Sequence, residues 1–400
     1  MRYFLYSHDG FGLGHTRRHL AIAAALAGLD SQASILLASG ADDVFRLGLP
    51  PQVEVLKLPG LRKTSENGYL ARRLPGATTE IRALRSAVLE AAVKTFRPAV
   101  TLVDKHPFGA CGEFCAALHA IKHMGGQAVL GLRDILDDPD ALAREWRPQN
   151  LPESIGEFYD LVLIYGEPAI FDPITAYAFP KSAMTRSHFC GYVVNRDPSG
   201  PWTAGLNSQP RNRPVVLATT GGGEDGAFLL QTFIETAAGS PWEAIAIAGP
   251  MTPESELEKL QGLSTRAGVR LHGFLPNVGG LFASADALVS MGGYNTIAEA
   301  VSRGIPTVCV PRTAPRSEQV LRAQAFERLG LLRVVHPSQL CSELLRGAIT
   351  IALSTKRQDV LQRAASLLTF DGAGRAARHL FTLAANQKSS GQAAFAGQFS

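Results

Sequence analysis

The sequence predicts two doubly wound α/β domains, and three observations predict them. The 400 residues are too many for one ordinary core, because a domain typically takes roughly 150–200 residues. Short apolar runs without polar alternation recur between helix-period segments, which is typical of parallel strands covered on both faces. A stretch rich in Pro, Gly, Ser and Asn at 196–214 interrupts this pattern, which then restarts. We therefore expect two domains and a linker.

The composition excludes several classes of protein. Apolar residues make up 46% and charged residues 18%, which excludes a disordered chain. The most apolar helical stretch, at 19–29, is about half of the ~20 residues that a membrane span needs, and the first residues turn polar before any signal-peptide core develops. A net charge of +4 is too small for nucleic-acid binding, and the five cysteines are expected to be reduced. We therefore expect a cytoplasmic protein.

The first predicted domain covers residues 1–195. Its helix-period segments include 16–29 and 78–96, the second opening with a Thr-Thr-Glu start signal. Its strands are expected at 3–7, 34–39, 53–58, 99–104, 128–134, 161–166 and 189–194.

The second predicted domain covers residues 215–372. A last helix at 373–386 is expected, with the option of returning to the first domain, and a flexible tail at 387–400. Ligands of such paired domains bind at the carboxyl ends of the strands, so we expect them in a cleft between the domains. Strands are expected at 215–220, 244–249, 269–274, 287–292, 307–311 and 332–337.

A glycine-rich loop follows the first strand and leads into a long helix. Gly10, Gly12 and Gly14 allow close approach of a ligand to the backbone, and the start of a helix favours an anion. The spacing differs from the dinucleotide-binding fingerprint, and no acidic residue ends the second strand, so NAD is not expected. His15 lies where this loop meets the helix, which makes it a candidate base.

A second glycine-rich loop opens the second domain and is predicted to bind phosphate. Thr220 is followed by three successive glycines, Gly221, Gly222 and Gly223, and then by a helix-period segment. Such a loop supplies a cradle of backbone N–H groups for a phosphate. The alternative is a merely tight turn.

A third loop is predicted to bind phosphate and sugar. Gly292 and Gly293 end a later strand, and Asn295 or Thr296 is expected to cap the next helix. Glu299, about one turn into that helix, can accept two hydrogen bonds from ribose hydroxyls. The alternative is that Glu299 only interacts with the helix dipole.

Other charged groups give weaker signals. Asp138 and Asp140 form an Asp-x-Asp pair, which we expect to be a solvated turn rather than a metal site. Lys105 and His106 follow the strand that ends at Asp104, and either can touch an acceptor. A basic stretch is expected to be a solvated loop, with an anionic acceptor or a membrane as the alternative partner; it consists of Arg62, Lys63, Arg72 and Arg73.

These motifs together resemble those of a known family. The glycine loop with His15, the second glycine loop, and GGYNTIAEAVSRGIPTVCVP (292–311) followed by Glu318 and Gln319 are similar to those of GT-B glycosyltransferases. The nearest well-known member is the N-acetylglucosaminyltransferase of peptidoglycan synthesis, and the closest match is a bacterial "predicted glycosyltransferase" group related to it. The resemblance spans roughly residues 1–385. It implies the GT-B fold, in which two Rossmann-like domains face each other across a cleft.

The resemblance also implies roles for residues of this chain. His15 would be the catalytic base at the acceptor hydroxyl, and Asp104 would orient it. The backbone near Phe274 and Leu275 would contact the base of the nucleotide, and Glu299 its ribose. The diphosphate would bind to residues of two loops: Thr220, Gly221, Gly222 and Gly223, and Gly292, Gly293, Tyr294, Asn295 and Thr296. The donor sugar would face Glu318 and Gln319. The acceptor side would include Gly12, Gly14, Arg17 and Lys105.

The implied reaction is transfer of a sugar from a nucleotide-diphosphate sugar, expected to be UDP-linked, to an acceptor hydroxyl. No cofactor or metal is expected. Where retaining relatives carry a glutamate this chain has Met291, which favours inversion. Where the peptidoglycan enzyme has two glutamines this chain has Glu318 and Gln319, so the donor sugar can differ. The acceptor is expected to be lipid-linked or a small molecule, and the protein to be cytoplasmic, free or peripheral to the inner membrane face.

Three alternatives remain open from the sequence. Gly12 to Arg18, followed by Leu20 and Ala21, also resembles the nucleotide-sugar hydrolase of pseudaminic acid synthesis, in which water replaces the acceptor. An epimerase of nucleotide sugars is a second enzymatic alternative. The third is a protein that holds a nucleotide without chemistry.

Overall fold

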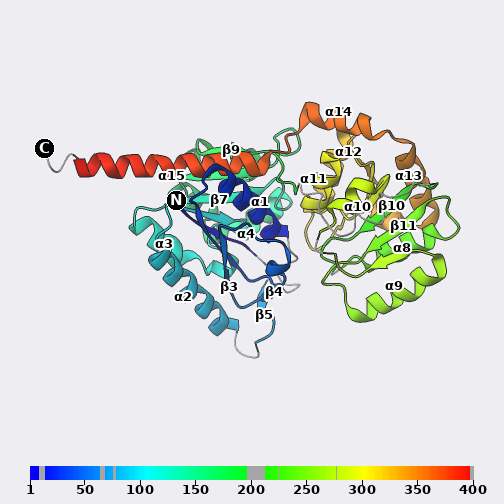
Figure 1. Cartoon of the computed structure of the whole chain (residues 1–400), viewed down its shortest axis with the longest axis horizontal. Coiled ribbons are helices and arrows are strands. Elements are labelled where there is room, and N and C mark those ends of the chain that lie inside the picture. The colour runs from blue at the N-terminus through cyan, green and yellow to red at the C-terminus, as the bar shows by residue number, and fades with distance from the viewer. Residues whose placement is uncertain are drawn as a thin grey trace. The chain divides into compact units, whose positions relative to one another are not determined.

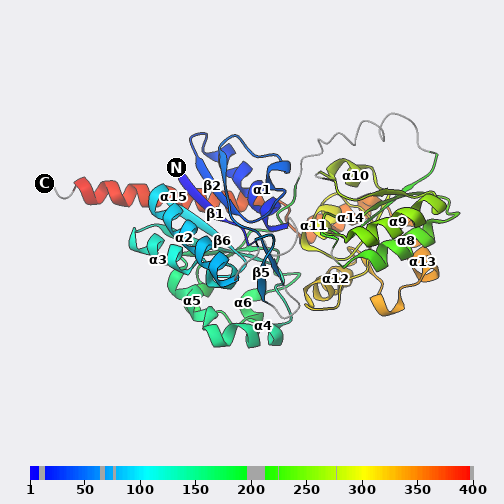
Figure 2. The same cartoon turned by 90° about the horizontal axis from the view of Figure 1, so that it is seen from below.

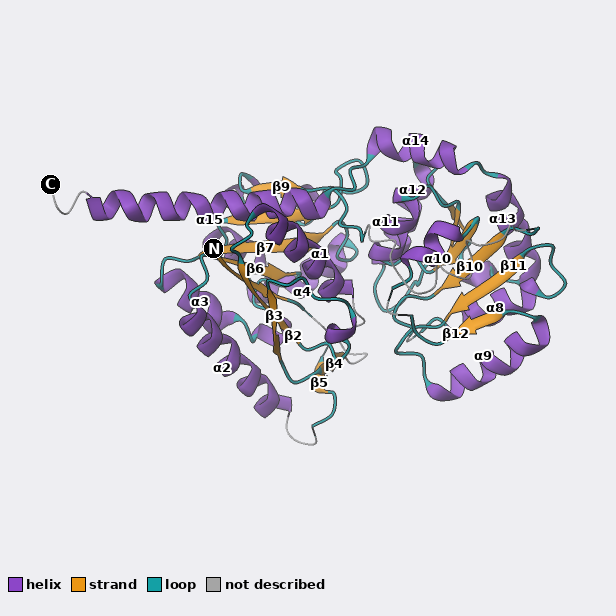
Figure 3. Cartoon of the chain, in the orientation of Figure 1, coloured by secondary structure: helices purple, strands orange, loops and turns teal. Residues whose placement is uncertain are grey.

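A computed structural model of the chain describes residues 1–8, 14–63, 68–74, 78–195, 212–223, 225–275 and 277–396. These residues divide into two compact units, Met1–Val193 together with Asp371 onward, and Val194–Phe370. Each unit contains a parallel sheet with helices on both faces (Figure 3), as the sequence predicts. The linker predicted at 196–214 falls mostly on 196–211, outside the described residues.

The first unit is built on a parallel sheet whose described strands run in the order β3-β2-β1-β6-β7-β8-β9. Apart from the last, these strands lie within one or two residues of the predicted ones. The strands in the middle of the sheet are buried on both faces and read as apolar runs, whereas the edge strand at 53–57 exposes Glu54 and Lys57. The strands are β1 (Arg2–Tyr6), β2 (Ser34–Ser39), β3 (Val53–Lys57), β6 (Val100–Asp104), β7 (Gln127–Arg133), β8 (Leu161–Tyr165) and β9 (Ser187–Phe189).

Helices cover both faces of this sheet (Figure 1). Phe4 and Tyr6 of β1 share one hydrophobic core with Leu89 and Leu118 of α2 and α3. Side chains alternate along a strand, so Leu5 faces the opposite side, where α1 and α15 lie against each other. The helices of the unit are α1 (Gly14–Leu29), α2 (Thr78–Phe96), α3 (Cys115–His123), α4 (Pro139–Trp146), α5 (Leu151–Phe158), α6 (Pro173–Ala176), α7 (Lys181–Met184) and α15 (Gly372–Ala396).

Three features of this unit differ from the sequence prediction. The strand expected at 189–194 is instead β9, which ends at Phe189, and Gly191 with φ of 78° turns the chain away. A short antiparallel hairpin, β4 (Leu61–Lys63) and β5 (Tyr69–Ala71), occupies the expected basic loop. The last helix, α15, ends at Ala396 and so runs beyond residue 386, where the sequence prediction ended it.

The second unit repeats the design with the described strand order β12-β11-β10-β13-β14-β15, all parallel. Its strands are β10 (Val215–Thr219), β11 (Glu243–Ile247), β12 (Arg270–His272), β13 (Ala287–Ser290), β14 (Thr307–Cys309) and β15 (Arg333–Val334). Its helices are α8 (Ala227–Ala237), α9 (Glu254–Ala267), α10 (Gly279–Ser284), α11 (Tyr294–Ser302), α12 (Glu318–Arg328), α13 (Ser342–Ser354) and α14 (Arg357–Leu367).

Two hydrophobic cores sandwich the second sheet (Figure 2). Val216 of β10 packs with α8, α9 and α13, whereas its neighbour Leu217 packs with α10 and α11. The central strands β10, β13 and β14 are therefore buried on both sides, whereas the edge strands β12 and β15 are partly exposed.

The strand order locates the functional edge of each unit. If the strands of each sheet are numbered in chain order, both sheets begin 3-2-1-4. The fourth strand therefore lies on the opposite side of the first strand from the second and third. This switch falls between β1 and β6 in the first unit and between β10 and β13 in the second. In doubly wound sheets, ligands bind at the carboxyl ends of the strands beside this switch point. His15 and Asp104 follow one switch point, and Gly221 and Gly292 the other.

Candidate active site

His15 and Asp104 meet at the switch point of the first unit. His15 is the second residue of α1, directly after the glycine loop, and Asp104 is the last residue of β6. His15 Nδ1 and Asp104 Oδ2 form a short hydrogen bond. Both residues are buried, with 8% and 0% of their surface exposed. Gly14 begins α1, while Gly10 and Gly12 lie outside the described residues.

Arg18 completes a buried triad with these two residues. One helical turn after His15, its Nη2 donates to Asp104 Oδ1 at 2.9 Å and to Oδ2 at 3.0 Å. Burial by itself would raise the pKa of Asp104, but Arg18 and His15 outweigh it, so this pKa lies well below its ordinary value. The carboxylate is therefore ionised at neutral pH.

His15 is consequently neutral and oriented. Burial lowers its pKa to about 3, and the attraction of Asp104 offsets this only in part. Since an ionised carboxylate only accepts hydrogen bonds, Nδ1 of His15 must carry the proton that it shares with Asp104. Its Nε2 then keeps a lone pair. A neutral imidazole held in this tautomer by a carboxylate is suited to act as a general base.

The two other predicted acceptor residues are neighbours of this triad in the chain. Arg17 is half-buried on α1, directly before Arg18. Lys105 directly follows Asp104 and has φ of 70°, and its backbone N–H donates to the Gly131 carbonyl at 2.8 Å. The bond to Gly131, on the adjacent strand β7, fixes the backbone that carries Lys105 at the edge of the sheet.

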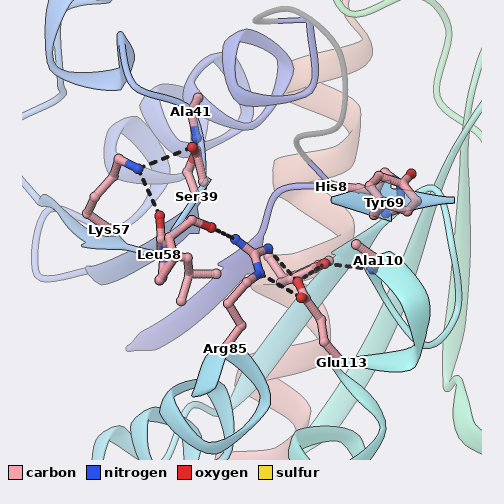
Figure 4. Close-up of polar contacts among 12 residues, drawn as sticks. His8, Ser39, Ala41, Lys57, Leu58, Tyr69, Arg85, Ala110 and Glu113 are labelled. Carbon is pink, nitrogen blue, oxygen red and sulfur yellow. Dashed lines mark hydrogen bonds and ion pairs between the residues drawn. The ribbon is translucent and has the colours of Figure 1, made fainter. Parts of the chain in front are cut away.

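A second group of polar side chains, which sequence reasoning missed, lies beside His15. His8 is the second residue after β1 and is 3% exposed. Its Nε2 lies 2.7 Å from the hydroxyl of Tyr69 on β5 (Figure 4). The His8 ring centroid is 6.0 Å from that of His15 and 6.5 Å from that of His106. Burial and then the charge of Lys105 lower the pKa of His8 well below its ordinary value.

A buried ion pair anchors the hairpin that carries Tyr69 (Figure 4). Arg85 of α2 donates through Nε to Glu113 Oε2 at 2.6 Å and through Nη2 to Oε1 at 2.5 Å. Tyr6 donates to the same carboxylate at 2.7 Å, and Arg85 also donates to the carbonyl of Pro59, two residues before β4. Every charged atom of this pair thus has a partner, which is what burial of charge requires.

The loop of three glycines after β10 is shaped by backbone contacts. Gly221 and Gly223 have φ of 70° and 89°, and a Cβ on Gly223 would collide with Thr252 and the carbonyl of Ala248. Gly222 between them is half-buried, and its carbonyl accepts from the Met251 backbone N–H at 2.9 Å. The carbonyl of Gly222 therefore holds the loop against the segment after β11. The Gly221 N–H donates to Thr219 Oγ1 at 3.3 Å, so the N–H groups of Gly222 and Gly223 are what this loop can offer an anion.

The same switch point is completed by two further residues. Thr220, predicted to bind phosphate, donates its hydroxyl to the carbonyl of Ala248 and so holds the glycine loop in place. Gly292, at the end of β13, has φ of 82°, and a Cβ there would lie 2.9 Å from Cys309 Sγ. Because β10 pairs with β13, with Thr219 opposite Ser290, the two loops leave adjacent strands at the same edge of the second sheet.

Helix α11 begins earlier than predicted. Gly293 is its N-cap residue, and no side chain caps it among the described residues. The prediction that Asn295 or Thr296 caps this helix is therefore wrong, because Gly292 and Gly293 complete the turn and both polar residues lie within the helix.

The side chains of the first two turns of α11 are mostly buried. Tyr294, its first residue, is 3% exposed, and the guanidinium carbon of Arg322 lies 5.7 Å from the centre of its ring. Glu299 is in the second turn and is 7% exposed, so its carboxylate lies largely away from bulk solvent. A ligand at the start of this helix would therefore meet backbone N–H groups before the Tyr294 ring.

The remaining residues predicted to contact the sugar donor lie in two places, at 274–275 and at the start of α12. Leu275 packs into the core with Leu281 and Phe282, so only its backbone is available to a nucleotide base; Phe274 beside it is half-buried. Glu318 and Gln319 start α12, and both are held by Arg312: Nη2 donates to Glu318 Oε1 at 3.0 Å, and the backbone N–H donates to Gln319 Oε1 at 3.1 Å.

Other predicted charged groups have structural partners. Asp138 is the N-cap of α4 and accepts from the backbone N–H groups of Asp140 and Ala141, so the Asp-x-Asp pair is a helix start rather than a solvated turn. In the basic stretch, Arg72 donates to the Leu61 carbonyl and Arg73 pairs with Asp42. Among the described residues, no group of three or more His, Cys, Asp or Glu is arranged to hold a metal ion.

Solved structures identify the fold of this chain. The calicheamicin glycosyltransferase CalG4 matches 96% of this chain and 98% of its own, with a TM-score of 0.60 and 18% identity. MurG from Acinetobacter baumannii matches 95% of this chain and 99% of its own, with a TM-score of 0.57 and 15% identity. The chain has the GT-B fold of glycosyltransferases, which confirms the predicted fold class.

Sequence comparison identifies the nearer relationship. Residues 227–372 match the "Glycosyltransferase family 28 C-terminal domain". The UDP-N-acetylglucosamine–N-acetylmuramyl-(pentapeptide) pyrophosphoryl-undecaprenol N-acetylglucosamine transferases of Paenarthrobacter aurescens and Lachnoclostridium phytofermentans are 29% and 35% identical to the chain, over 47% and 44% of it. The chain spans about half the length of these curated relatives, 52% and 44%. It is a GT-B protein related to them, which confirms the resemblance found in the sequence.

No helix among the described residues is both long and apolar enough to cross a membrane.

Proposed function

We propose that this chain is an inverting glycosyltransferase that moves a sugar from a UDP-linked donor to an acceptor hydroxyl. The observation that carries the proposal is the buried His15–Asp104 pair, in a chain whose second unit matches a glycosyltransferase family 28 domain. His15 is the base, Asp104 holds its tautomer, and Arg18 keeps Asp104 ionised. Burial keeps His15 neutral and so able to accept a proton, while Arg18 and His15 keep the Asp104 carboxylate ionised.

The proposed step is a single displacement. The acceptor oxygen forms a bond to the anomeric carbon of the donor sugar while its proton passes to His15 Nε2. The bond from that carbon to the diphosphate oxygen breaks, and its electron pair leaves with UDP. Met291 supports inversion, because it stands where retaining relatives carry a glutamate and its buried thioether cannot act as a carboxylate.

The departing diphosphate needs positive charge or N–H donors, since it gains negative charge as the bond breaks. We assign this task to the backbone N–H groups of Gly222 and Gly223 and to those of the first turn of α11. Helix starts and glycine-rich loops bind phosphate without a metal ion. We therefore propose that the reaction needs no divalent metal, and activity in excess EDTA is the expected result.

The substrates follow from the relatives. Their names describe transfer of N-acetylglucosamine from UDP-N-acetylglucosamine to a lipid-linked acceptor. We propose a UDP-sugar as the donor and a lipid-linked or small hydroxylated acceptor, used in the cytoplasm or at the inner membrane face. The change from two glutamines to Glu318 and Gln319 leaves room for a donor sugar other than N-acetylglucosamine.

The test is UDP release from a panel of UDP-sugars, with and without a panel of lipid-linked and soluble acceptors. We expect release that depends on an acceptor and a β-linked product from an α-linked donor. His15→Ala should slow it roughly 10²–10⁴-fold, whereas His123→Ala, which changes an exposed histidine of α3, should not slow it. Free sugar formed equally fast without acceptor would instead identify a hydrolase, and a retained anomer would exclude the single displacement.

A further inference from the structure

Arg312 joins two loops of the second unit. It lies in the segment between β14 and α12, and its Nη1 donates to Asp225 Oδ2 at 3.1 Å while its Nη2 donates to Glu318 Oε1 at 3.0 Å. Asp225 belongs to the loop that follows β10, two residues after the last glycine of the cradle. One guanidinium group therefore links the loop after β10 to the loop after β14.

The sheet order shows what this link passes over. In the sheet, β13 lies between β10 and β14. The Arg312 side chain joins the loop after β10 to the loop after β14, and it therefore crosses the carboxyl end of β13. The chain there turns through Gly292 and Gly293 into α11. Contacts from α12 agree with this placement, because Arg322 donates to the Gly292 carbonyl at 3.3 Å and a Cβ on Gly292 would lie 3.4 Å from the Gln319 carbonyl oxygen.

Arg312 offsets part of the negative charge beside it: the charges of Arg312, Asp225 and Glu318 sum to −1, and without the guanidinium they would sum to −2. Its side chain is 24% exposed, that of Glu318 is 6% exposed, and that of Asp225 is 42% exposed. Without the guanidinium, two carboxylates would face the start of α11 and repel an anion there. Burial lowers the pKa of Arg312, but Glu318 and Asp225 outweigh this and raise the pKa above its ordinary value, so the cation is secure.

Arg312 also keeps donors for a ligand. A guanidinium has five N–H groups in a planar fork, and the two contacts with carboxylates use one on each terminal nitrogen. Its Nε has no partner among the described residues but is buried, so the N–H groups left for a ligand are the second ones on the two terminal nitrogens. Unused N–H groups on a fixed, positively charged fork match the oxygens of a phosphate group.

We propose that Arg312 binds the diphosphate of the donor and that Asp225 and Glu318 position it for this task. The inference rests on the proposed function, since it adds a side-chain cation to a phosphate site otherwise formed by backbone N–H groups. Arg312 contacts the group that becomes more negative as the sugar leaves. It therefore favours the departing nucleoside diphosphate over the sugar-bound form.

The test measures, by calorimetry on the full chain, the binding affinity of three ligands that differ in their number of phosphates: uridine, UMP and UDP. In the wild type we expect affinity to rise with each phosphate. Arg312→Ala should weaken UDP binding roughly 10- to 100-fold, because a charge-assisted contact with phosphate is lost, while uridine binding changes less than about 2-fold. Arg312→Lys should lie between the two, since it keeps the charge but loses the fork.

Two controls separate this role from general damage. Arg266→Ala removes an exposed arginine of α9 and should leave the affinities for uridine, UMP and UDP unchanged. Adding Asp225→Asn to Arg312→Ala should restore part of the UDP affinity, because it removes one unpaired carboxylate, and a purely structural link would give no such recovery.

The outcomes distinguish this inference from the proposed function. If the wild type binds UDP and Arg312→Ala binds it equally well, or loses UDP and uridine affinity alike, Arg312 does not contact the diphosphate and the proposed function stands. If the wild type binds none of UDP, dTDP and GDP, both proposals are overturned.

Discussion

His15 and Asp104 share a buried hydrogen bond although 89 positions of sequence separate them. They meet because β1 and β6 are adjacent parallel strands, with Tyr6 paired to Val103, so that the segments after both strands leave the sheet at the same edge. Arg18, one turn along α1, holds the same carboxylate. The sheet thus brings together a base, its orienting group and a cation without any local sequence motif that contains all three.

The first prediction concerns catalysis by His15. His15→Ala should lower kcat by roughly 10²–10⁴-fold, the usual effect of losing a general base. The KD for UDP, measured by calorimetry, should stay within about 2-fold, because the proposed nucleotide contacts all lie in the second unit. Near-normal turnover of this variant would reduce His15 to a structural residue.

The second prediction compares two glutamates that each pair with a cation. Glu113→Gln leaves Arg85 buried without its counter-charge and should lower the free energy of unfolding by about 3–5 kcal/mol. Glu90→Gln breaks the exposed pair with Lys94 on α2 and should cost less than about 1 kcal/mol. Urea unfolding of both variants measures the difference. Equal costs would mean that burial of the Arg85–Glu113 pair has no energetic consequence.

The third prediction is that acid destabilises the fold well before the carboxylates protonate. Burial lowers the pKa of His15 to about 3 and that of His19 to about 4, and it lowers the pKa of His8 well below 6.5. Below pH 6.5 the unfolded chain therefore binds more protons than the folded chain. The free energy of unfolding should be largest above pH 6.5 and should fall as the pH drops from 6.5 towards 4. Asp104 adds to the loss only at lower pH, since its pKa is depressed below 3.8.

His19 offers a matched test of this dependence, because neither of its ring nitrogens has a hydrogen-bond partner among the described residues. His19→Gln should reduce the slope of unfolding free energy against pH by about 1 kcal/mol per pH unit between pH 6 and 5, the contribution of one proton. His123→Gln, at an exposed site, should leave the slope unchanged. The same stability of the wild type at pH 7.5 and pH 5 would contradict the prediction.

The sequence predicts those parts of the fold that are encoded locally. Continuous apolar runs mark strands buried on both faces, and glycines after β1, β10 and β13 mark the loops at the switch points, so the positions of His15, Gly221 and Gly292 in the fold were predicted. Edge elements were predicted poorly: β9 is short, and the β4–β5 hairpin has too few residues for a period-2 pattern.

The missed site residues depend on contacts between distant segments. Tyr69 reaches His8 across 61 positions, and Arg312 reaches Asp225 across 87. A histidine two residues after a strand, or an arginine in a loop, carries no local signal of such a partner. The role of Asp104 was inferred from family resemblance for the same reason. The role of Glu299 was argued from its place about one turn into a helix as well as from the resemblance, and both roles stay predictions.

The last prediction is that Glu299 binds the ribose of the donor. Its carboxylate is buried in the second turn of α11, whose start is proposed to hold the diphosphate, and a ribose extends from the diphosphate by about one helical step. Loss of its two hydrogen bonds in Glu299→Ala should weaken UDP binding by about 2–4 kcal/mol, or roughly 30- to 1,000-fold. Glu258→Ala, an exposed glutamate of α9, is the control and should bind UDP normally.

A comparison with 2′-deoxy-UDP separates ribose binding from the alternative role of Glu299 at the helix dipole. If the carboxylate accepts from the 2′-hydroxyl, the wild type should bind the deoxy ligand poorly, and Glu299→Ala should lose little further affinity for it. The two changes would then be strongly non-additive, as expected for groups in direct contact. Fully additive losses would show that Glu299 does not touch this hydroxyl. A charge near the start of α11 would then account for its whole effect, which is worth about 0.3–1 kcal/mol at most exposed sites.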